Sequence, residues 1–380
     1  MAILRFVSLI LLLAFLAGCS QLQPPAGATF HCVVSTQGEN FLINGQPTLR
    51  GRSWSGHSLE GLLPNARLVQ ATFDDLNPQT RSRWNYADGT PFSAERNTRE
   101  MVAAIPSYRA HGLLAFTINL QGGNPLGYSS LAQTWINSAF ENDGSLRPEY
   151  MQRTQSIIEE ADRHGMVVIL GLFYAAQQAH FNDEAATLRA TDNAVDWITS
   201  RGYTNVLIEI ANECDMSAYQ PVVRPNRVAE LVKRVQDRSA KAGLATPARR
   251  LLVSVSLGGG RIPTPDLVAA CDFVLLHGNG VGTPDGIRRM ITQTRALPTY
   301  GSKPIVFNED DHFDFDQPDN NLLAAFTNHA SWGLFDYRQN NESWANGFQS
   351  VPTDWTIDSP RKEGFFNLLK QVSGEQCLPP

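Results

Sequence analysis

Two glutamates that end apolar segments are the residues of this chain best suited to do chemistry. Glu213 ends the segment 208–213, IEIANE, and Glu309 ends the segment 305–309, IVFNE. A carboxylate at the end of a buried strand costs desolvation free energy, so such positions are more often functional than structural. Two carboxyl groups about 5 to 5.5 Å apart can cleave a glycosidic bond with retention, one as nucleophile and the other as acid. We predict that Glu213 and Glu309 are catalytic; the alternative is a pair of structural carboxylates in salt bridges.

The elements that must position these glutamates alternate along the chain. From about residue 48, short apolar segments rich in β-branched residues alternate with amphipathic helical stretches, which is typical of a parallel sheet with helical crossovers. The expected strands are 48–54, 113–120, 166–173, 205–211, 251–256, 273–277, 304–307 and 332–337. This pattern predicts an α/β fold, a closed (β/α)8 TIM barrel, in which the ends of strands four and seven face each other across the mouth. A doubly wound open sheet is the alternative, because periodicity alone does not show closure.

The predicted barrel is a single domain, residues 32–380, with long loops on its C-terminal face. The surplus sequence lies in the segments 55–92, 119–146 and 338–359, each of which follows a predicted strand. Loops after the strands build the active-site face of this fold. Before the first strand, Asn44-Gly45 predicts a hairpin over 40–48 that closes the bottom of the barrel.

The N-terminus has the features of an export signal. Arg5 precedes an apolar run over 6–17, which is shorter than the about 20 residues that span a bilayer and typical of a signal-peptide core. The run ends in LAGC at 16–19, which resembles the lipobox of bacterial lipoproteins. This resemblance implies a signal peptide over 1–18, a lipidated Cys19 as membrane anchor, a linker over 19–31 and, with Ser20 next, an outer-membrane location. The alternative is a signal peptide cut nearby, with Cys19 incidental.

Composition excludes several other classes. The chain has 31 Lys plus Arg against 37 Asp plus Glu, a net charge of −6, and no basic run, so nucleic acid is an unsuitable partner. Its five cysteines include no CxxC pair, so no structural zinc is expected. The acidic run from Asp310 to Asp319 lacks the glycine and glutamate of an EF-hand, which favours a solvated loop. We expect a monomer that needs no metal or cofactor.

The two glutamate segments resemble a known group of enzymes. Asn212-Glu213 and Glu309 at the ends of strands four and seven look like the clan A glycoside hydrolases, the retaining (β/α)8 enzymes that include the family 5 cellulases and mannanases. The preface NGQP at 44–47 is similar to the opening hairpin of that group. The resemblance implies that Glu213 is the acid/base, Glu309 the nucleophile and Asn212 the donor to the sugar 2-hydroxyl. It also implies a site role for His277, which falls on the histidine of a His-x-Tyr motif whose third residue here is Asn279; the alternative is a satisfied core histidine.

Other positions depart from the family pattern. Family 5 chains usually carry an arginine on strand two that orients the nucleophile, whereas 115–119 here reads AFTIN, and Arg52 is the candidate substitute. Cys214 stands where a proline is usual. Among the aromatic residues, Trp54, Trp332 and Tyr337 flank strand ends and are the best candidates to stack on sugar rings, although each could instead pack in the core.

The sequence therefore predicts an exported, lipid-anchored glycosidase that hydrolyses a β-linked oligo- or polysaccharide by double displacement. The alternative is a catalytically degenerate barrel that binds glycans at the cell surface, motivated by the missing arginine and by Cys214. A barrel enzyme of other chemistry would need a strand-end lysine or a His/Asp metal cluster, and the sequence offers neither. Cys32 and Cys377 both fall at the barrel bottom, so we expect them to pair.

Overall fold

The computed structural model describes residues 32–128 and 132–374. The predicted signal peptide over 1–18, the predicted lipid site Cys19 and the linker up to residue 31 lie outside these ranges. Within the described ranges, no helix combines the length and the apolar character that crossing a bilayer requires. The predicted disulfide is not confirmed, because Cys32 is a buried thiol and Cys377 lies outside the described residues.

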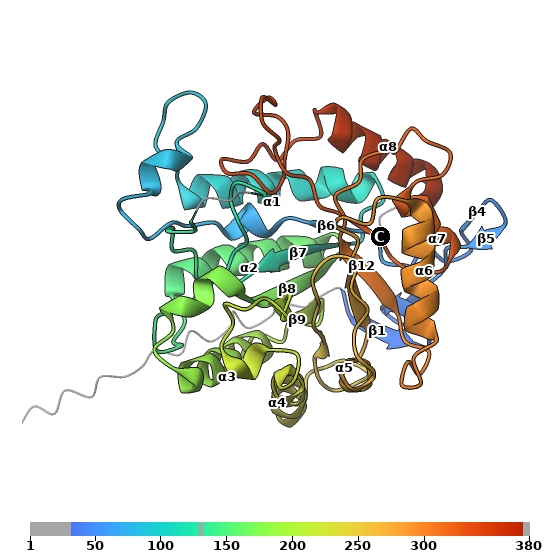
Figure 1. The fold of residues 1–380 in the computed structure, drawn as a ribbon, viewed down its shortest axis with the longest axis horizontal. Helices are drawn as coiled ribbons and strands as arrows, with labels where there is room; N and C mark the ends of the chain where they lie inside the picture. Colours follow the sequence, from blue (N-terminus) through green and yellow to red (C-terminus); the bar gives the residue numbers. More distant parts are fainter. Residues whose placement is uncertain (1–31, 129–131, 375–380) are drawn as a thin grey trace, which may run out of the picture.

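Eight parallel strands of the described chain form a barrel, and each is followed by a helix (Figure 1). The strands are β6 (Asn65–Arg67), β7 (Ala115–Asn119), β8 (Val167–Tyr174), β9 (Val206–Asn212), β10 (Leu252–Ser254), β11 (Val274–His277), β12 (Ile305–Glu309) and β13 (Gly333–Leu334). The helices are α1 (Ala94–Ala110), α2 (Pro148–Arg163), α3 (Glu184–Ser200), α4 (Val228–Ala242), α5 (Pro265–Ala270), α6 (Pro284–Arg295), α7 (Asn321–Thr327) and α8 (Pro360–Ser373).

The strands follow one another around the barrel in sequence order. One sheet has the order β10-β9-β8-β7-β6-β13, and β11 pairs with β12. Parallel bridges at Val306↔Ser331 and Asp310↔Leu334 join β12 to β13. On the other side, the amide of Asp272, just before β11, donates to the Val253 carbonyl of β10 at 2.9 Å. This closure confirms the predicted TIM barrel over the open sheet.

The first barrel strand is not where the sequence pattern placed it. The segment 48–54 ends in β4 (Ser53–Trp54), which forms a small hairpin with β5 (His57–Ser58) outside the barrel. The true first strand, β6, lies within the segment predicted as a loop. It has only three residues, and the polar Asn65 and Arg67 are both buried, so it lacks the apolar run by which buried strands are recognised.

A three-stranded antiparallel sheet covers the bottom of the barrel. It consists of β1 (Val34–Gln37), β2 (Asn40–Ile43) and β3 (Gln46–Pro47), with the turn residues Asn44 and Gly45 at φ 53° and 74°. Positive φ at both turn positions is the type I′ pattern that Asn-Gly favours, which confirms the predicted hairpin. Phe41 of this sheet is fully buried against Phe273, just before β11, with ring centroids 5.9 Å apart. The sheet therefore closes the end at which the strands begin.

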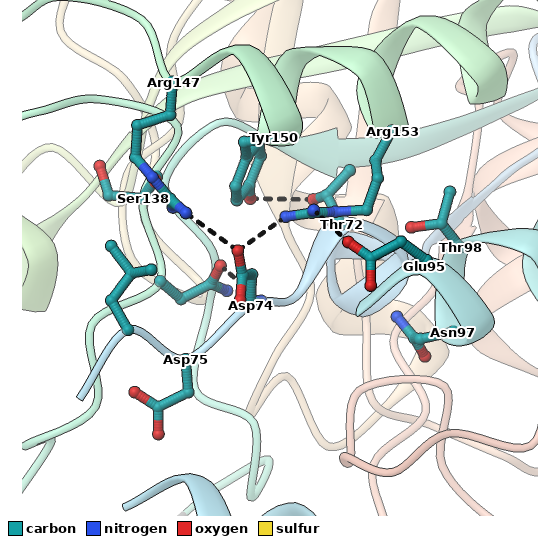
Figure 2. A network of polar contacts seen from close by, with 12 residues as sticks. Thr72, Asp74, Asp75, Glu95, Asn97, Thr98, Ser138, Arg147, Tyr150 and Arg153 are labelled. Atoms are coloured by element: carbon teal, nitrogen blue, oxygen red, sulfur yellow. Dashed lines mark hydrogen bonds and ion pairs between the residues drawn. The ribbon is translucent and has the colours of Figure 1, made fainter. Parts of the chain in front are cut away.

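A buried charge network ties the segment after β6 to α1 and α2 (Figure 2). One oxygen of Asp74 accepts from Arg147 at 3.0 Å and from Arg153 at 2.9 Å, and Arg153 also reaches Glu95 of α1 at 3.2 Å. Arg147 and Arg153 are each more than nine-tenths buried, whereas the Asp74 side chain is 23% exposed. Arg147 also donates to the Ser138 carbonyl at 2.8 Å. The network therefore fixes two loops on the C-terminal side of the strands.

Replacing Asp74 by asparagine should destabilise the fold strongly. The change removes the Asp74 carboxylate from both buried guanidinium groups and leaves Arg153 with Glu95 alone. Breaking a partly exposed network of this kind should lower the free energy of unfolding by about 2 to 4 kcal/mol. Urea denaturation of Asp74→Asn measures this loss. The control is Asp88→Asn, whose exposed carboxylate lies 3.6 Å from Arg96 and which should leave the urea midpoint unchanged. Equal midpoints for the two variants would show that the network contributes nothing.

Candidate active site

The ends of β9, β11 and β12 bring three predicted site residues together at the barrel mouth. Glu309 is the last residue of β12 and 5% exposed, His277 ends β11 fully buried, and Glu213 directly follows β9. One carboxylate oxygen of each glutamate and a ring nitrogen of His277 all lie within 4.8 Å of one another. Neighbouring parallel strands end at the same edge, which is why residues far apart in the chain meet here.

Arg67 of β6 connects this group to the barrel interior. Its Nε lies 2.9 Å from Glu309 Oε2, and its Nη2 donates to Asn212 Oδ1 at 2.6 Å. Burial alone would lower the pKa of Arg67, but the carboxylates of Glu309, Glu209 and Glu213 raise it, so the guanidinium stays charged. Sequence reasoning missed Arg67 because its strand lay in the predicted loop. The available signal was a single arginine within the largely apolar run LLPNARLV at 62–69.

The other oxygen of Glu309 has a partner that the sequence also did not identify. The side-chain amide of Asn279, two residues after β11, donates to Glu309 Oε1 at 2.6 Å. Burial raises the pKa of Glu309 above the ordinary glutamate value, while Arg67, His277 and this hydrogen bond lower it and Glu213 raises it further. A hydrogen bond from Asn279 therefore holds one oxygen of Glu309, and the ion pair with Arg67 holds the other.

Glu213 lies in a strained backbone conformation. Its φ is 53°, in the left-handed region that a residue with a side chain adopts at a cost of about 1 to 3 kcal/mol. The backbone is held there by Ser256, whose hydroxyl accepts from the Glu213 amide at 3.0 Å and whose carbonyl accepts from the Cys214 amide at 3.0 Å. Strain of this kind is typical of functional sites, because the surrounding structure must enforce it.

His277 lies between the carboxylates. Its Nδ1 is 3.2 Å from Glu213 Oε1 and 3.7 Å from Glu309 Oε2, and its Nε2 is 3.9 Å from Glu209 Oε1. Burial alone would lower the pKa of His277, but the three carboxylates raise it above its ordinary value. Burial also raises the pKa of Glu213, but the hydrogen bond and charge of His277 outweigh this and lower it. The carboxylates therefore favour the protonated form of the imidazole, which lies beside both glutamates.

Glu209 lies below this group, inside the barrel, as its strand parity predicts. It is fully buried and accepts from Ser256 Oγ at 2.7 Å and from Asn308 Nδ2 at 3.2 Å. These contacts agree with the structural role expected for Glu209.

No family model matches the sequence, and no curated protein is detectably similar to it. Solved structures do match. They include an endo-1,4-beta-mannanase from Rhizomucor miehei (TM-score 0.55, 10% identity, 90% of this chain and 100% of that chain). A GH5-4 broad specificity endoglucanase from Bacteroides salanitronis also matches (TM-score 0.52, 9% identity, 83% and 94% covered). A third is the beta-mannanase of the blue mussel Mytilus edulis (TM-score 0.50, 13% identity, 92% and 99% covered).

The chain shares the (β/α)8 fold of these enzymes. At such low identity the likeness establishes the fold alone, so the chemistry has to be argued from the side chains at the barrel mouth.

Aromatic residues gather beside the carboxylates, but not all of those predicted. The ring of Tyr337 lies 4.8 Å from that of Tyr128, and Phe335 lies 5.5 Å from Tyr128. Tyr128 is 52% exposed, and its pKa is raised by partial burial and by carboxylates that include Glu309. This places the Tyr128 hydroxyl near the mouth, so Tyr337 belongs to an aromatic cluster there, and it is the member predicted as a best candidate for stacking.

Trp332 does not offer a face to a ligand. The residue is fully buried, its Nε1 donates to Asp310 Oδ2 at 2.8 Å, and its ring packs edge-on against Phe315. The prediction that Trp332 stacks on a sugar is therefore wrong, and the core alternative holds.

Arg52 and Trp54 lie far from the site. Trp54 belongs to the β4–β5 hairpin. The Arg52 guanidinium packs against Gly374, just after α8, where an added Cβ would lie 2.5 Å from the guanidinium carbon. Helices in this fold run back toward the bottom, so the end of α8 marks the face opposite the mouth. Figure 1 shows this hairpin on the right, away from the segment between β6 and α1 on the left. Both site predictions are wrong, and Arg67 has the contact expected of Arg52.

Two groups of described side chains have the spacing of metal ligands: Glu213 with His277 and Glu309, and Asp310 with Asp311 and His312. In the first group, the Arg67 guanidinium contacts the Glu309 carboxylate and places a positive charge where a cation would bind. In the second, hydrogen bonds from His312 and Trp332 already occupy the Asp310 carboxylate. Both arrangements favour hydrogen bonding and proton transfer over metal binding.

Proposed function

We propose that this protein is a retaining glycoside hydrolase that cleaves β-linked oligo- or polysaccharides through Glu309 and Glu213. The observation that carries the proposal is their spacing, with one oxygen of each within 4.8 Å of the other at the mouth of a barrel. Retaining pairs have carboxyl groups about 5 to 5.5 Å apart, whereas inverting pairs are about 6.5 to 9.5 Å apart to admit a water molecule. The pair fits the retaining class.

In the first step Glu309 attacks the anomeric carbon and forms a glycosyl ester, while Glu213 protonates the departing oxygen. In the second step Glu213 removes a proton from water, which attacks the ester and releases the sugar. The assignment of roles rests on the contacts of each group. Arg67 and Asn279 hold both oxygens of Glu309 in one orientation, which suits a nucleophile, whereas Glu213 has the more exposed side chain, at 21%.

The proton must be on Glu213 when the reaction begins, although His277 lowers the pKa of this residue. A sugar bound in the mouth would displace water from the exposed side of Glu213, and loss of hydration raises a carboxyl pKa. Glu309 is already buried, so the same event changes its environment less, and Arg67 continues to stabilise its charge. Substrate binding therefore moves the proton toward the acid.

Asn212 supports the same assignment. Its Oδ1 accepts from Arg67, which orients its amide so that Nδ2 is the donor left for a ligand. A donor next to Glu213 suits the 2-hydroxyl of the sugar at the cleavage point, where hydrogen bonds strengthen in the transition state. The degenerate-barrel alternative was motivated by a missing arginine and by Cys214, and Arg67 removes the first of these two motives.

The names of the neighbours in fold, which specify endo-1,4-beta-mannanase, beta-mannanase and endoglucanase activities, support a proposal for the substrate class. We therefore propose a β-mannan or a β-glucan as substrate. We also propose an outer-membrane lipid anchor at Cys19, supported by the LAGC segment at 16–19.

The stereochemistry of hydrolysis tests this function. Galactomannan, xyloglucan and soluble β-glucans would be incubated with the protein, and the first-formed anomer would be followed by proton NMR before mutarotation. We expect the β-anomer to appear first. First formation of the α-anomer would show inversion and exclude the ester mechanism, while glycan binding without any turnover would establish the degenerate barrel.

A further inference from the structure

Asn279 contacts the proposed nucleophile Glu309 but is not itself one of the two proposed catalytic groups. Its side-chain amide donates to Glu309 Oε1 at 2.6 Å, which is short for a bond between nitrogen and oxygen and typical of a donor facing a charged acceptor. Because a carboxylate accepts and cannot donate, this contact fixes which end of the amide faces Glu309.

The backbone just before Asn279 is held by two neighbouring segments. The Gly278 amide donates to the Glu309 carbonyl at 2.7 Å, and the Gly260 amide donates to the His277 carbonyl at 2.9 Å. A Cβ on Gly259 would lie 2.4 Å from the Asn279 carbonyl oxygen, so the loop after β10 packs directly against this residue. The side chain of Asn279 thus projects from a rigid position that neighbouring loops define.

We propose that Asn279 is a positioning residue that sets the orientation and the charge state of Glu309. The inference rests on the proposed function for its kinetic consequences, but its electrostatic consequence is independent of any substrate. A donor to the charged form of a carboxyl group stabilises that form, so Asn279 favours the ionised form of Glu309 in a buried site that disfavours charge. An amide does this without titrating, so the support is constant across the working pH range.

The first measurement needs no glycan. Carbon-13 NMR of glutamate carboxyl groups, with Glu309 assigned by its loss in Glu309→Gln, gives the pKa of Glu309 in wild type and in Asn279→Ala. We expect the pKa of Glu309 to rise by about one unit in Asn279→Ala, because the charged form loses its hydrogen-bond donor. One unit is a tenfold change in the ionisation equilibrium. The matched control is Asn321→Ala, which removes an amide that donates at 3.0 Å to Asp310. Asp310 directly follows Glu309 in the chain. The control should leave the Glu309 pKa unchanged.

The second measurement uses the pH profile of turnover. Asn279→Ala should lower kcat by about 10- to 100-fold with little change in KM, because a hydrogen bond to a charged group is lost at the reacting carboxylate. Asn279→Asp should behave differently, since a protonated aspartic acid can still donate to Glu309. It should retain activity at acidic pH and lose it as pH rises and both carboxyl groups ionise. A merely structural residue would not give this pH-dependent difference between the two variants.

Gly259→Ala is the second route to the same test, because it keeps the amide but displaces it through the 2.4 Å contact. It should raise the Glu309 pKa in the same direction. An unchanged Glu309 pKa in both Asn279→Ala and Gly259→Ala would overturn the inference. A raised pKa in a protein that cleaves no glycan would instead leave the inference standing and refute the proposed function.

Discussion

Glu309→Ala should abolish glycan hydrolysis, with a loss on the order of 10⁵-fold in kcat, because no residue remains to form the glycosyl ester. Arg67 and Asn279 would then face an empty position that a small anion can occupy. Azide or formate should restore part of the activity, and because the anion attacks from the face that Glu309 vacated, the product should have the inverted configuration. Rates with and without azide, together with NMR of the product, measure both effects.

The matched control for this variant is Asp314→Ala, an exposed carboxylate of the loop that follows β12. It should hydrolyse glycans at the wild-type rate. Circular dichroism should show the same folded spectrum for both variants, since Glu309 ends a strand whose ladder bonds are made by the backbone. Near-normal activity of Glu309→Ala would place the nucleophile elsewhere and contradict the proposed pair.

Glu213→Ala should separate the two chemical steps. Loss of a general acid typically costs about 10² to 10⁴-fold, so hydrolysis of natural glycans should fall by at least this factor. A dinitrophenyl glycoside should still react at Glu309, because dinitrophenolate departs without a proton. The ester should then accumulate, since no base activates water, and rapid mixing should show a burst of dinitrophenolate followed by a slow phase. Azide needs no base, so it should release the sugar as the β-glycosyl azide with retained configuration.

Met216→Ala provides the control from the same loop, because this side chain is 48% exposed. It should show neither a burst nor dependence on azide. If Glu213→Ala lost activity equally on natural and dinitrophenyl substrates, Glu213 would hold structure at the mouth and another group would be the acid. A product azide of inverted configuration would exchange the roles of the two glutamates.

The sequence by itself determined the architecture and the two central carboxylates. A continuous apolar strand such as β8 can only be buried on both faces, so the alternation of such strands with helices predicted the barrel correctly. Glu213 and Glu309 stood out because each ends such a strand with a charge whose burial is costly. Parallel strands then place both residues on one face, whatever the details of the loops.

Only the tertiary structure decided which residues support this pair. Arg67 lies on a three-residue strand whose inward positions are polar, so no local pattern marks it, and its contact with Glu309 joins the first and seventh strands of the barrel. The role of Asn279 likewise depends on its hydrogen bond to Glu309 of the neighbouring strand β12. Trp332 and Trp54 show the reverse case, since aromatic side chains suit both a core and a binding face. Which of these they do depends on what packs against them after the chain has closed, and sequence spacing does not carry that information.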